Sequence, residues 1–239
     1  MIFANYHTHT TFCDGRDTPE QLVQEALRLG CPAIGFSGHS IAPYDYAGMT
    51  PEHEAQYRAE VRRLQAACAG QIRILCGVEQ DYWSEASMDG YDYVIGGVHY
   101  LRRGSEFRSV DGTPTILRSI VDDWFGGDWY AMAEEYYRLV GNLYEKTRCR
   151  VIAHFDLIEK FNEDGSLFDR NAPRYPAACQ GKRRDHRNRQ PQSQAESYES
   201  PRRIRHQPEK SMVGLRRGLR SGRGRACLRK RGRGAAGQP

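Results

Sequence analysis

The sequence predicts an α/β fold in which the strands of a parallel sheet alternate with helices. Short apolar runs alternate with capped helical segments along residues 1–178. Such strand–helix repeats favour a parallel sheet with crossover helices. Polar side chains that could act as ligands follow several of these runs, and this arrangement is typical of a (β/α) barrel. Because the runs are short and unevenly spaced, we expect a distorted barrel.

Strands are predicted from short runs of aliphatic, aromatic and β-branched residues. They are expected at residues 2–6, 33–37, 72–78, 91–98 and 151–153. Each run delivers a polar side chain at or just past its end. In chain order these side chains are His7, His39, Glu79, His99 and His154.

Two helices are predicted from their first turns. Thr18-Pro19-Glu20 and Thr50-Pro51-Glu52 each place threonine as the N-cap and proline at the first helical position. The first helix should end at Gly30, since glycine favours the backbone conformation that follows a helix. The second should run to about residue 69. Two more helices are expected over residues 115–125 and 129–147.

Charge divides the chain into two segments. Residues 1–178 carry 17 Lys and Arg against 26 Asp and Glu, whereas residues 179–239 carry 18 against 4. The second segment has no Phe or Trp, and its apolar residues show no sustained period. It would bury too little apolar surface to offset an ordering cost of roughly 1–2 kcal/mol per residue. We expect a folded domain over 1–178 and a basic, disordered tail over 179–239.

The cysteines and the hydropathy pattern exclude other classes of protein. The seven cysteines are an odd number without a pairing pattern, which argues against a disulfide framework and favours a reducing compartment. No apolar stretch approaches the roughly 18 residues of a membrane span, and the first residues do not resemble a signal peptide. The expectation is a soluble cytoplasmic protein with no membrane partner; the oligomeric state is left open.

The strand-end side chains predict a site for divalent metal ions. His7 and His9 are two residues apart on an extended segment, so their imidazoles point to one face and can hold one ion. A carboxylate such as Glu79 after an apolar strand is costly to bury unless it is paired or metal-bound. Histidine and carboxylate ligands without a CxxC pair suit zinc, iron or manganese.

Structural interpretations compete at several of these positions. A lone histidine at a strand end is more often structural, and Asp14 before Gly15 fits a turn as well as a ligand. Asp81 fits either a neighbour of a ligand or a loop residue. His53, in the first turn of a helix, is assigned to solvent, and Cys13 is interpreted as a free structural thiol.

The ordered motifs resemble those of the PHP superfamily (polymerase and histidinol phosphatase), and in detail its histidinol-phosphatase branch. The resemblance covers about residues 1–178. Its motifs are His7-Thr8-His9-Thr10, Phe12-Cys13-Asp14-Gly15, Gly35-Phe36-Ser37-Gly38-His39, Gly77-Val78-Glu79-Gln80-Asp81-Tyr82, Gly96-Gly97-Val98-His99-Tyr100 and Ala153-His154-Phe155-Asp156-Leu157-Ile158.

The resemblance implies a distorted (β/α)7 barrel with three divalent metal ions at the strand ends. The first ion would be held by His7 and His9, with Glu79 bridging. The second would be held by Asp14 and His39, and the third by Glu79, His99 and His154. Asp14 could double as a proton donor. Lys160 is a candidate for contacting the phosphate or helping the leaving alkoxide, with an exposed helix lysine as the alternative.

The same resemblance implies a phosphomonoesterase that hydrolyses L-histidinol phosphate in histidine biosynthesis. Clustered divalent cations would acidify a bridging water, bind the phosphate oxygens and stabilise an in-line displacement. One alternative is another phosphoesterase, such as a nucleotide or DNA 3′-phosphate hydrolase. The other is an inactive metal-binding scaffold with a basic tail that binds nucleic acid. Under the first interpretation, the expected partner is the small phosphorylated substrate and not nucleic acid.

The tail departs from the family pattern. The family closes its site with an Asp-x-His near the end of the last strand, whereas the only aspartate after residue 178 is Asp185, directly followed by His186. We therefore expect a barrel that is incomplete at its C-terminus. The tail is either a genuine basic extension or the product of a reading-frame shift near residue 178. Its 15 Arg against 3 Lys favour the shift, which predicts a poorly active chain.

Overall fold

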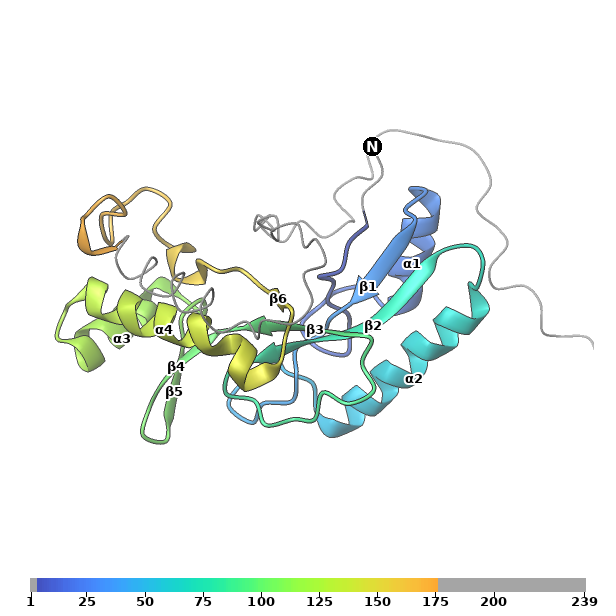
Figure 1. Cartoon of the computed structure of the whole chain (residues 1–239), viewed down its shortest axis with the longest axis horizontal. Coiled ribbons are helices and arrows are strands. Elements are labelled where there is room, and N and C mark those ends of the chain that lie inside the picture. The colour runs from blue at the N-terminus through green and yellow to red at the C-terminus, as the bar shows by residue number, and fades with distance from the viewer. Residues whose placement is uncertain (1–3, 176–239) are drawn as a thin grey trace, which may run out of the picture. The chain divides into compact units, whose positions relative to one another are not determined.

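The computed structural model describes residues 4–175 of the 239-residue chain (Figure 1). These residues fall into two compact units. The first unit comprises residues 4–39 and 47–78, and the second comprises residues 40–46 and 79–175. The predicted tail, with Asp185 and His186, lies outside the described residues.

The first unit combines two helices with two parallel strands. Its elements are α1 (Pro19–Arg28), β1 (Ala33–Phe36), α2 (Pro51–Ala67) and β2 (Arg73–Asp81). β1 pairs with β2 in parallel, with Ala33 opposite Arg73 and Phe36 opposite Cys76. The last three residues of β2, from Glu79 onward, belong to the second unit.

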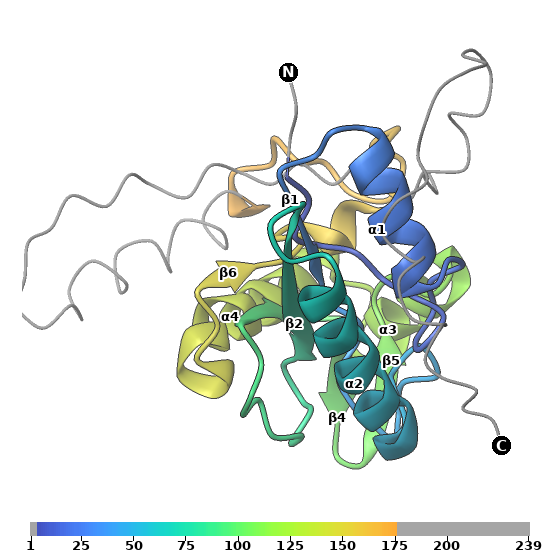
Figure 2. The ribbon, with the colours of Figure 1, turned by 90° about the vertical axis from the view of Figure 1, so that its right-hand side faces the viewer.

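The two helices of the first unit begin and pack as their sequences predict. Thr18 caps α1 in a reciprocal capping box with Gln21, and Thr50 accepts a hydrogen bond from the backbone N–H of His53. Both helices lie on the same side of β1 and β2 (Figure 2). Tyr57 of α2 is fully buried and its hydroxyl donates to the carbonyl of Gly77 at 2.7 Å, which ties the helix to β2.

The second unit contains a parallel strand pair, a hairpin and two long helices. Its elements are β3 (Tyr93–Gly97), β4 (Tyr100–Arg103), β5 (Glu106–Ser109), α3 (Pro114–Phe125), α4 (Trp129–Thr147), β6 (Val151–Ile152) and the 3₁₀ helix η1 (Leu157–Glu159). β3 pairs in parallel with β6, and β4 pairs with β5 in an antiparallel hairpin. The parallel strands follow the order β1-β2-β3-β6.

The core of the second unit forms where α3 and α4 pack together and against the strands. α4 contacts β3, and α3 contacts both α4 and β5. Side chains such as Leu117, Ile120, Met132 and Leu143 are fully buried. Burying one such side chain contributes about 1.5–3 kcal/mol to the free energy of folding. Because α4 packs on β3, this core holds β3 in place. It thereby fixes the residues that follow β3.

The structure confirms the parallel α/β architecture, and the four predicted helices begin and end within about two residues of their expected bounds. The strand expected over residues 2–6 is wrong in its described part, because only Asn5 forms an isolated bridge, to Ile34. The β4–β5 hairpin was not predicted. Closure of a barrel stays a prediction. Within residues 4–175, no helix is both long and apolar enough to cross a membrane.

Candidate metal centre

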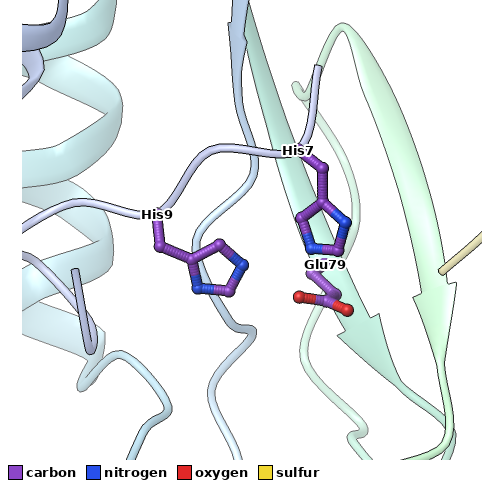
Figure 3. A group of neighbouring side chains, drawn as sticks. All are labelled: His7, His9 and Glu79. Atoms are coloured by element: carbon purple, nitrogen blue, oxygen red, sulfur yellow. The ribbon is translucent and has the colours of Figure 1, made fainter. Parts of the chain in front are cut away.

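The N-terminal segment brings two histidines to one side of the chain. It runs along β1, where the N–H of Gly35 donates to Asn5 at 2.7 Å and the N–H of Ser37 donates to Thr8 at 2.9 Å. His7 and His9 both project from the same side of this segment, as Figure 3 shows. Their ring centroids are 5.2 Å apart, which fits the prediction that both imidazoles share one face.

A tight turn adds Asp14 to this pair. The N–H groups of Cys13 and Gly15 both donate to the carbonyl of Thr10 at 3.0 Å. A Cβ at Gly15 would lie 2.3 Å from the backbone nitrogen of Thr10, so this turn requires glycine. The turn places Oδ1 of Asp14 2.7 Å from Nδ1 of His9.

His39, three residues after β1, completes the first cluster. Its Nε2 is 3.7 Å from Oδ2 of Asp14, and its ring centroid is 4.5 Å from that of His9. Burial alone would raise the pKa of Asp14, but hydrogen bonds and charge from His39 and His9 outweigh it and hold that pKa well below its usual value. Donor atoms of His9, Asp14 and His39 lie within 4.8 Å of one another.

A second cluster gathers Glu79, His99 and His154 in the second unit. Oε1 of Glu79 is 2.8 Å from Nε2 of His154 and 3.4 Å from Nε2 of His99. Glu79 is 1% exposed, and the rings of His99 and His154 meet edge to face at 4.7 Å. A carboxylate buried at the end of an apolar strand is costly unless it has partners. The imidazoles of His99 and His154 are those partners for Glu79.

Gly97, the last residue of β3, provides the space for this cluster. A Cβ at this position would lie 2.7 Å from Cε1 of His99, 3.2 Å from Oε1 of Glu79 and 3.3 Å from Cε1 of His154. All three ligand candidates therefore converge on one glycine. A Cβ there would force His99 to move, and Glu79 and His154 would have to give by a few tenths of an ångström.

Asp81, the last residue of β2, faces His99 from the side opposite Glu79. Its Oδ2 accepts the backbone N–H of His99 at 3.0 Å and lies 3.3 Å from Nδ1 of the ring. Burial alone would raise the pKa of Asp81, but the bonds from His99 and Tyr44 lower it. Burial likewise opposes the charged form of His99, yet Glu79 and Asp81 together raise the pKa of His99 well above its usual value.

Lys160 contacts an acidic residue that the sequence did not single out. Its Nζ lies 3.1 Å from the carbonyl and 3.3 Å from Oδ2 of Asp111. Burial alone would raise the pKa of Asp111, but the nearby charges of His99, Lys160 and His154 lower it. Lys160 thus forms an ion pair with Asp111 in the second unit.

The structure groups the predicted residues within their own units. His7, His9, Asp14 and His39 lie together in the first unit, and Glu79, His99, His154 and Lys160 lie in the second. His53 is exposed, as expected. Cys13 is a free thiol whose Sγ lies 3.8 Å from Nδ1 of His9.

Sequence reasoning left Asp81 open as a ligand neighbour or a loop residue and did not name Asp111; the contact of Asp81 with His99 confirms the first alternative. Asp81 is a strand residue and not part of a loop. A signal for it was available, because Glu79 and Asp81 are two apart on one strand and share a face. Asp111 offers no comparable signal, since its position depends on contacts made by the hairpin and Lys160.

The donor sets of both clusters fit a divalent metal ion of the zinc, iron or manganese type. Each contains imidazole nitrogens and a carboxylate, the ligands that these metals share. In the first cluster, the donor atoms of His9, Asp14 and His39 lie within 4.8 Å of one another. In the second cluster, the three side chains all lie close to Gly97. The arrangement can therefore hold cations and, through them, an anionic substrate.

Comparisons with known proteins place this geometry in context. A model of the PHP domain family matches residues 5–180. A histidinol-phosphatase of Bacillus subtilis is 29% identical over 182 residues, covering 65% of this chain and 66% of the relative. The chain thus matches slightly less than two thirds of that relative's length.

Two solved structures share the fold. One is a candidate histidinol phosphatase of Listeria monocytogenes, with a TM-score of 0.61 and 19% identity, covering 77% of this chain and 79% of that one. The other is a histidinol phosphate phosphatase of Lactococcus lactis in complex with zinc, L-histidinol and phosphate. It has a TM-score of 0.50 and 21% identity, and covers 75% of this chain and 70% of that one.

Proposed function

This chain belongs to the PHP domain family, and on that premise we propose that it is a metal-dependent phosphomonoesterase that hydrolyses L-histidinol phosphate. The observation that carries the proposal is the pair of histidine–carboxylate clusters, to which β1, β2, β3 and β6 contribute His39, Glu79, His99 and His154 near their C-terminal ends. The name of the Bacillus subtilis relative and the ligands of the Lactococcus lactis structure support the choice of substrate.

The proposal assigns the residues as follows. His7, His9, Asp14 and His39 hold metal in the first cluster, and Glu79, His99 and His154 hold it in the second. When bound, divalent ions supply an acidified water and positive charge for the phosphate oxygens. Three ions and a closed (β/α)7 barrel are part of the proposal and rest on the family resemblance.

Asp14 is assigned to metal binding more than to proton donation. The lowered pKa of Asp14 keeps its carboxylate ionised at neutral pH, which suits a ligand. Its second role as a proton donor would need the carboxyl to be protonated during the reaction. The contacts of His39 and His9 with the ionised carboxylate oppose that protonation.

Lys160 is proposed to bind the phosphate group of the substrate. Its side chain is 42% exposed and carries a charge that an incoming phosphate can use, and it forms an ion pair with Asp111. Replacing Lys160 by Met should raise KM more than it lowers kcat, because a ground-state phosphate contact is lost. An unchanged KM would remove Lys160 from the site.

The test compares substrates and metal states of the purified full chain. The chain is stripped with a chelator, reloaded with zinc, manganese or iron, and assayed for phosphate release. We expect release from L-histidinol phosphate that needs metal and exceeds release from p-nitrophenyl phosphate or a nucleoside monophosphate in kcat/KM. A preference for the nucleotide would favour another phosphoesterase.

Matched histidine variants make this test specific. His154→Gln should abolish activity, while His53→Gln should retain it, because His53 is exposed on α2 and belongs to none of the candidate ligand groups of the described residues. Metal binding without any phosphate release by the wild type would contradict the proposed activity and favour a metal-binding scaffold. A cytoplasmic location is part of the proposal, in keeping with the five free cysteines of the described residues.

A further inference from the structure

We propose that Tyr44 is a positioning residue that, through Asp81, fixes the tautomer and orientation of His99 for metal binding. The β4–β5 hairpin holds Tyr44 in place. The inference rests on the proposed function, since it takes His99 to be a metal ligand. It adds a side chain and a structural element that the motifs of the sequence do not include.

The first step is the geometry between Asp81 and His99. Oδ2 of Asp81 faces Nδ1 of His99 at 3.3 Å, and Nε2 of the same ring faces Glu79 at 3.4 Å. With its proton held on Nδ1 by the carboxylate, the imidazole presents the lone pair of Nε2 toward the Glu79 side. A carboxylate behind a histidine ligand sets the ring orientation in this way in many metal sites.

The second step is what holds Asp81. Its Oδ1 accepts the hydroxyl of Tyr44 at 2.7 Å and the backbone N–H of Trp83 at 2.9 Å. Its Oδ2 accepts the backbone N–H of His99 at 3.0 Å. Two of these three donors are backbone groups, so Tyr44 is the donor that a side-chain substitution can remove. Asp81 is 2% exposed, and bonds made in such an environment strongly constrain its rotamer.

The third step is what holds Tyr44. It lies in the segment 40–46, which has no helix or strand and is held at its start by a backbone hydrogen bond from Ser40 to Glu79 at 2.9 Å and by a turn in which the N–H of Asp45 donates to Ala42 at 2.9 Å. Its ring stacks on Phe107 of β5, with centroids 4.0 Å apart and planes 4° apart. Tyr100 of β4 meets the same ring edge to face at 5.1 Å. Aromatic contacts on both strands of the hairpin thus orient the hydroxyl toward Asp81.

The test is Tyr44→Phe, which removes the hydroxyl and keeps the ring on Phe107. The full chain is loaded with Zn²⁺, and affinity is measured by competition with a chromophoric chelator. We expect binding weaker than in the wild type, by less than the roughly 10- to 100-fold cost of losing the carboxylate that contacts a ligand directly, because Tyr44 acts through Asp81. In long-range ¹⁵N–¹H spectra of the histidine-labelled, zinc-loaded protein, the His99 signal for a proton on Nδ1 should weaken or broaden.

Tyr100→Phe is the matched control, because it makes the same chemical change on the neighbouring hairpin strand. The Tyr100 hydroxyl donates to Asp45 at 2.9 Å and not to Asp81, so zinc affinity and the His99 signal should stay as in the wild type. Wild-type affinity and tautomer in Tyr44→Phe would overturn the proposal. Equal losses in both variants would reduce Tyr44 to general packing and overturn it too.

These readouts need no turnover, which separates this inference from the proposed function. If the wild type binds zinc but hydrolyses nothing, only the proposed activity fails. If His99→Gln leaves zinc affinity unchanged, His99 is not a ligand and the inference fails, while the activity can still be measured. Loss of affinity in both Tyr44→Phe and His99→Gln supports the positioning role.

Discussion

At the level of single residues, the side chains of the second cluster pack so closely around Gly97 that a Cβ does not fit there. We predict that Gly97→Ala weakens zinc binding at least about tenfold, since its Cβ would displace all three ligand candidates. Gly96→Ala on the same strand is the comparison, because its Cβ would instead meet Cys149 at 2.4 Å and Leu143 at 3.2 Å.

The two variants should therefore separate metal affinity from stability. Gly96→Ala should lower the unfolding midpoint by overpacking, a cost of about 1–3 kcal/mol, and keep the zinc affinity. Gly97→Ala should also lower the unfolding midpoint, but it alone should weaken zinc binding, because its Cβ would contact the ligand candidates. Chelator competition and urea unfolding measure the two effects, and a larger affinity loss in Gly96→Ala would contradict the assignment of the cluster.

His99 gives the metal-free protein a specific dependence on pH. Its folded pKa is raised above 6.5, so its stabilising contribution is full below the unfolded pKa and is lost as pH rises through the folded pKa. We expect the wild type to be more stable than His99→Gln at about pH 6 when both are unfolded thermally in the presence of a chelator. This difference in stability should shrink as the pH rises further. An advantage that grows with pH would show that Glu79 and Asp81 do not hold the charged imidazole.

At the level of elements, α4 depends on a cap that is also an ion pair. Asp128 accepts the N–H groups of Tyr130 at 2.9 Å and Ala131 at 3.1 Å, and its other oxygen lies 2.6 Å from Arg174. Asp128→Ala should destabilise the protein by about 1–2 kcal/mol in urea unfolding, because two helix N–H groups lose their acceptor. Asp128→Asn keeps the cap and should recover most of that loss.

The predictable elements are those whose signals are local. Thr18 and Thr50, each before a proline, define their helix starts without reference to the rest of the chain. The β4–β5 hairpin also had a local signal, Gly104-Ser105 between two short alternating runs, with Gly104 at φ 62°. The N-terminal strand failed because its pairing with β1 is irregular and reduces to the bridge at Asn5.

The residues of the candidate site likewise include some with a local sequence signal and some without one. Glu79 and His99 could be predicted because they lie at or just past the ends of apolar strands, where the side chains of a parallel sheet gather. Asp111 and Tyr44 could not, because their positions depend on pairings between segments far apart in sequence. Sequence reasoning therefore finds the ligand candidates and leaves out the side chains that orient them.

At the level of the whole molecule, metal should act as a stabilising ligand. Zinc at about 100 times its Kd adds about 2.7 kcal/mol to the free energy of unfolding, which corresponds to a rise of roughly 5–10 °C in Tm. Calorimetry of the full chain with and without zinc measures this rise. His154→Gln should show a smaller rise than His53→Gln, and equal rises would place the bound zinc elsewhere.

The hypothesis that the tail arises from a reading-frame shift predicts a feature of the coding sequence. If the reading frame shifts near residue 178, restoring one or two bases there should give a C-terminus with strand-like runs and an Asp-x-His motif. Nucleotide sequencing of this region decides between the shift and a genuine basic extension. Stop codons in the other frames, with no such motif, would leave the basic extension as the explanation.

The free thiol beside the first cluster offers a chemical reporter of occupancy. Cys13 is half-buried next to His9, whereas Cys31 is half-buried in the loop after α1. An alkylating reagent should therefore modify Cys13 more slowly once zinc binds His9, while its rate at Cys31 stays constant. Peptide mass spectrometry of the two positions would follow metal loading of the first cluster in the unmodified chain, with no substrate and no substitution.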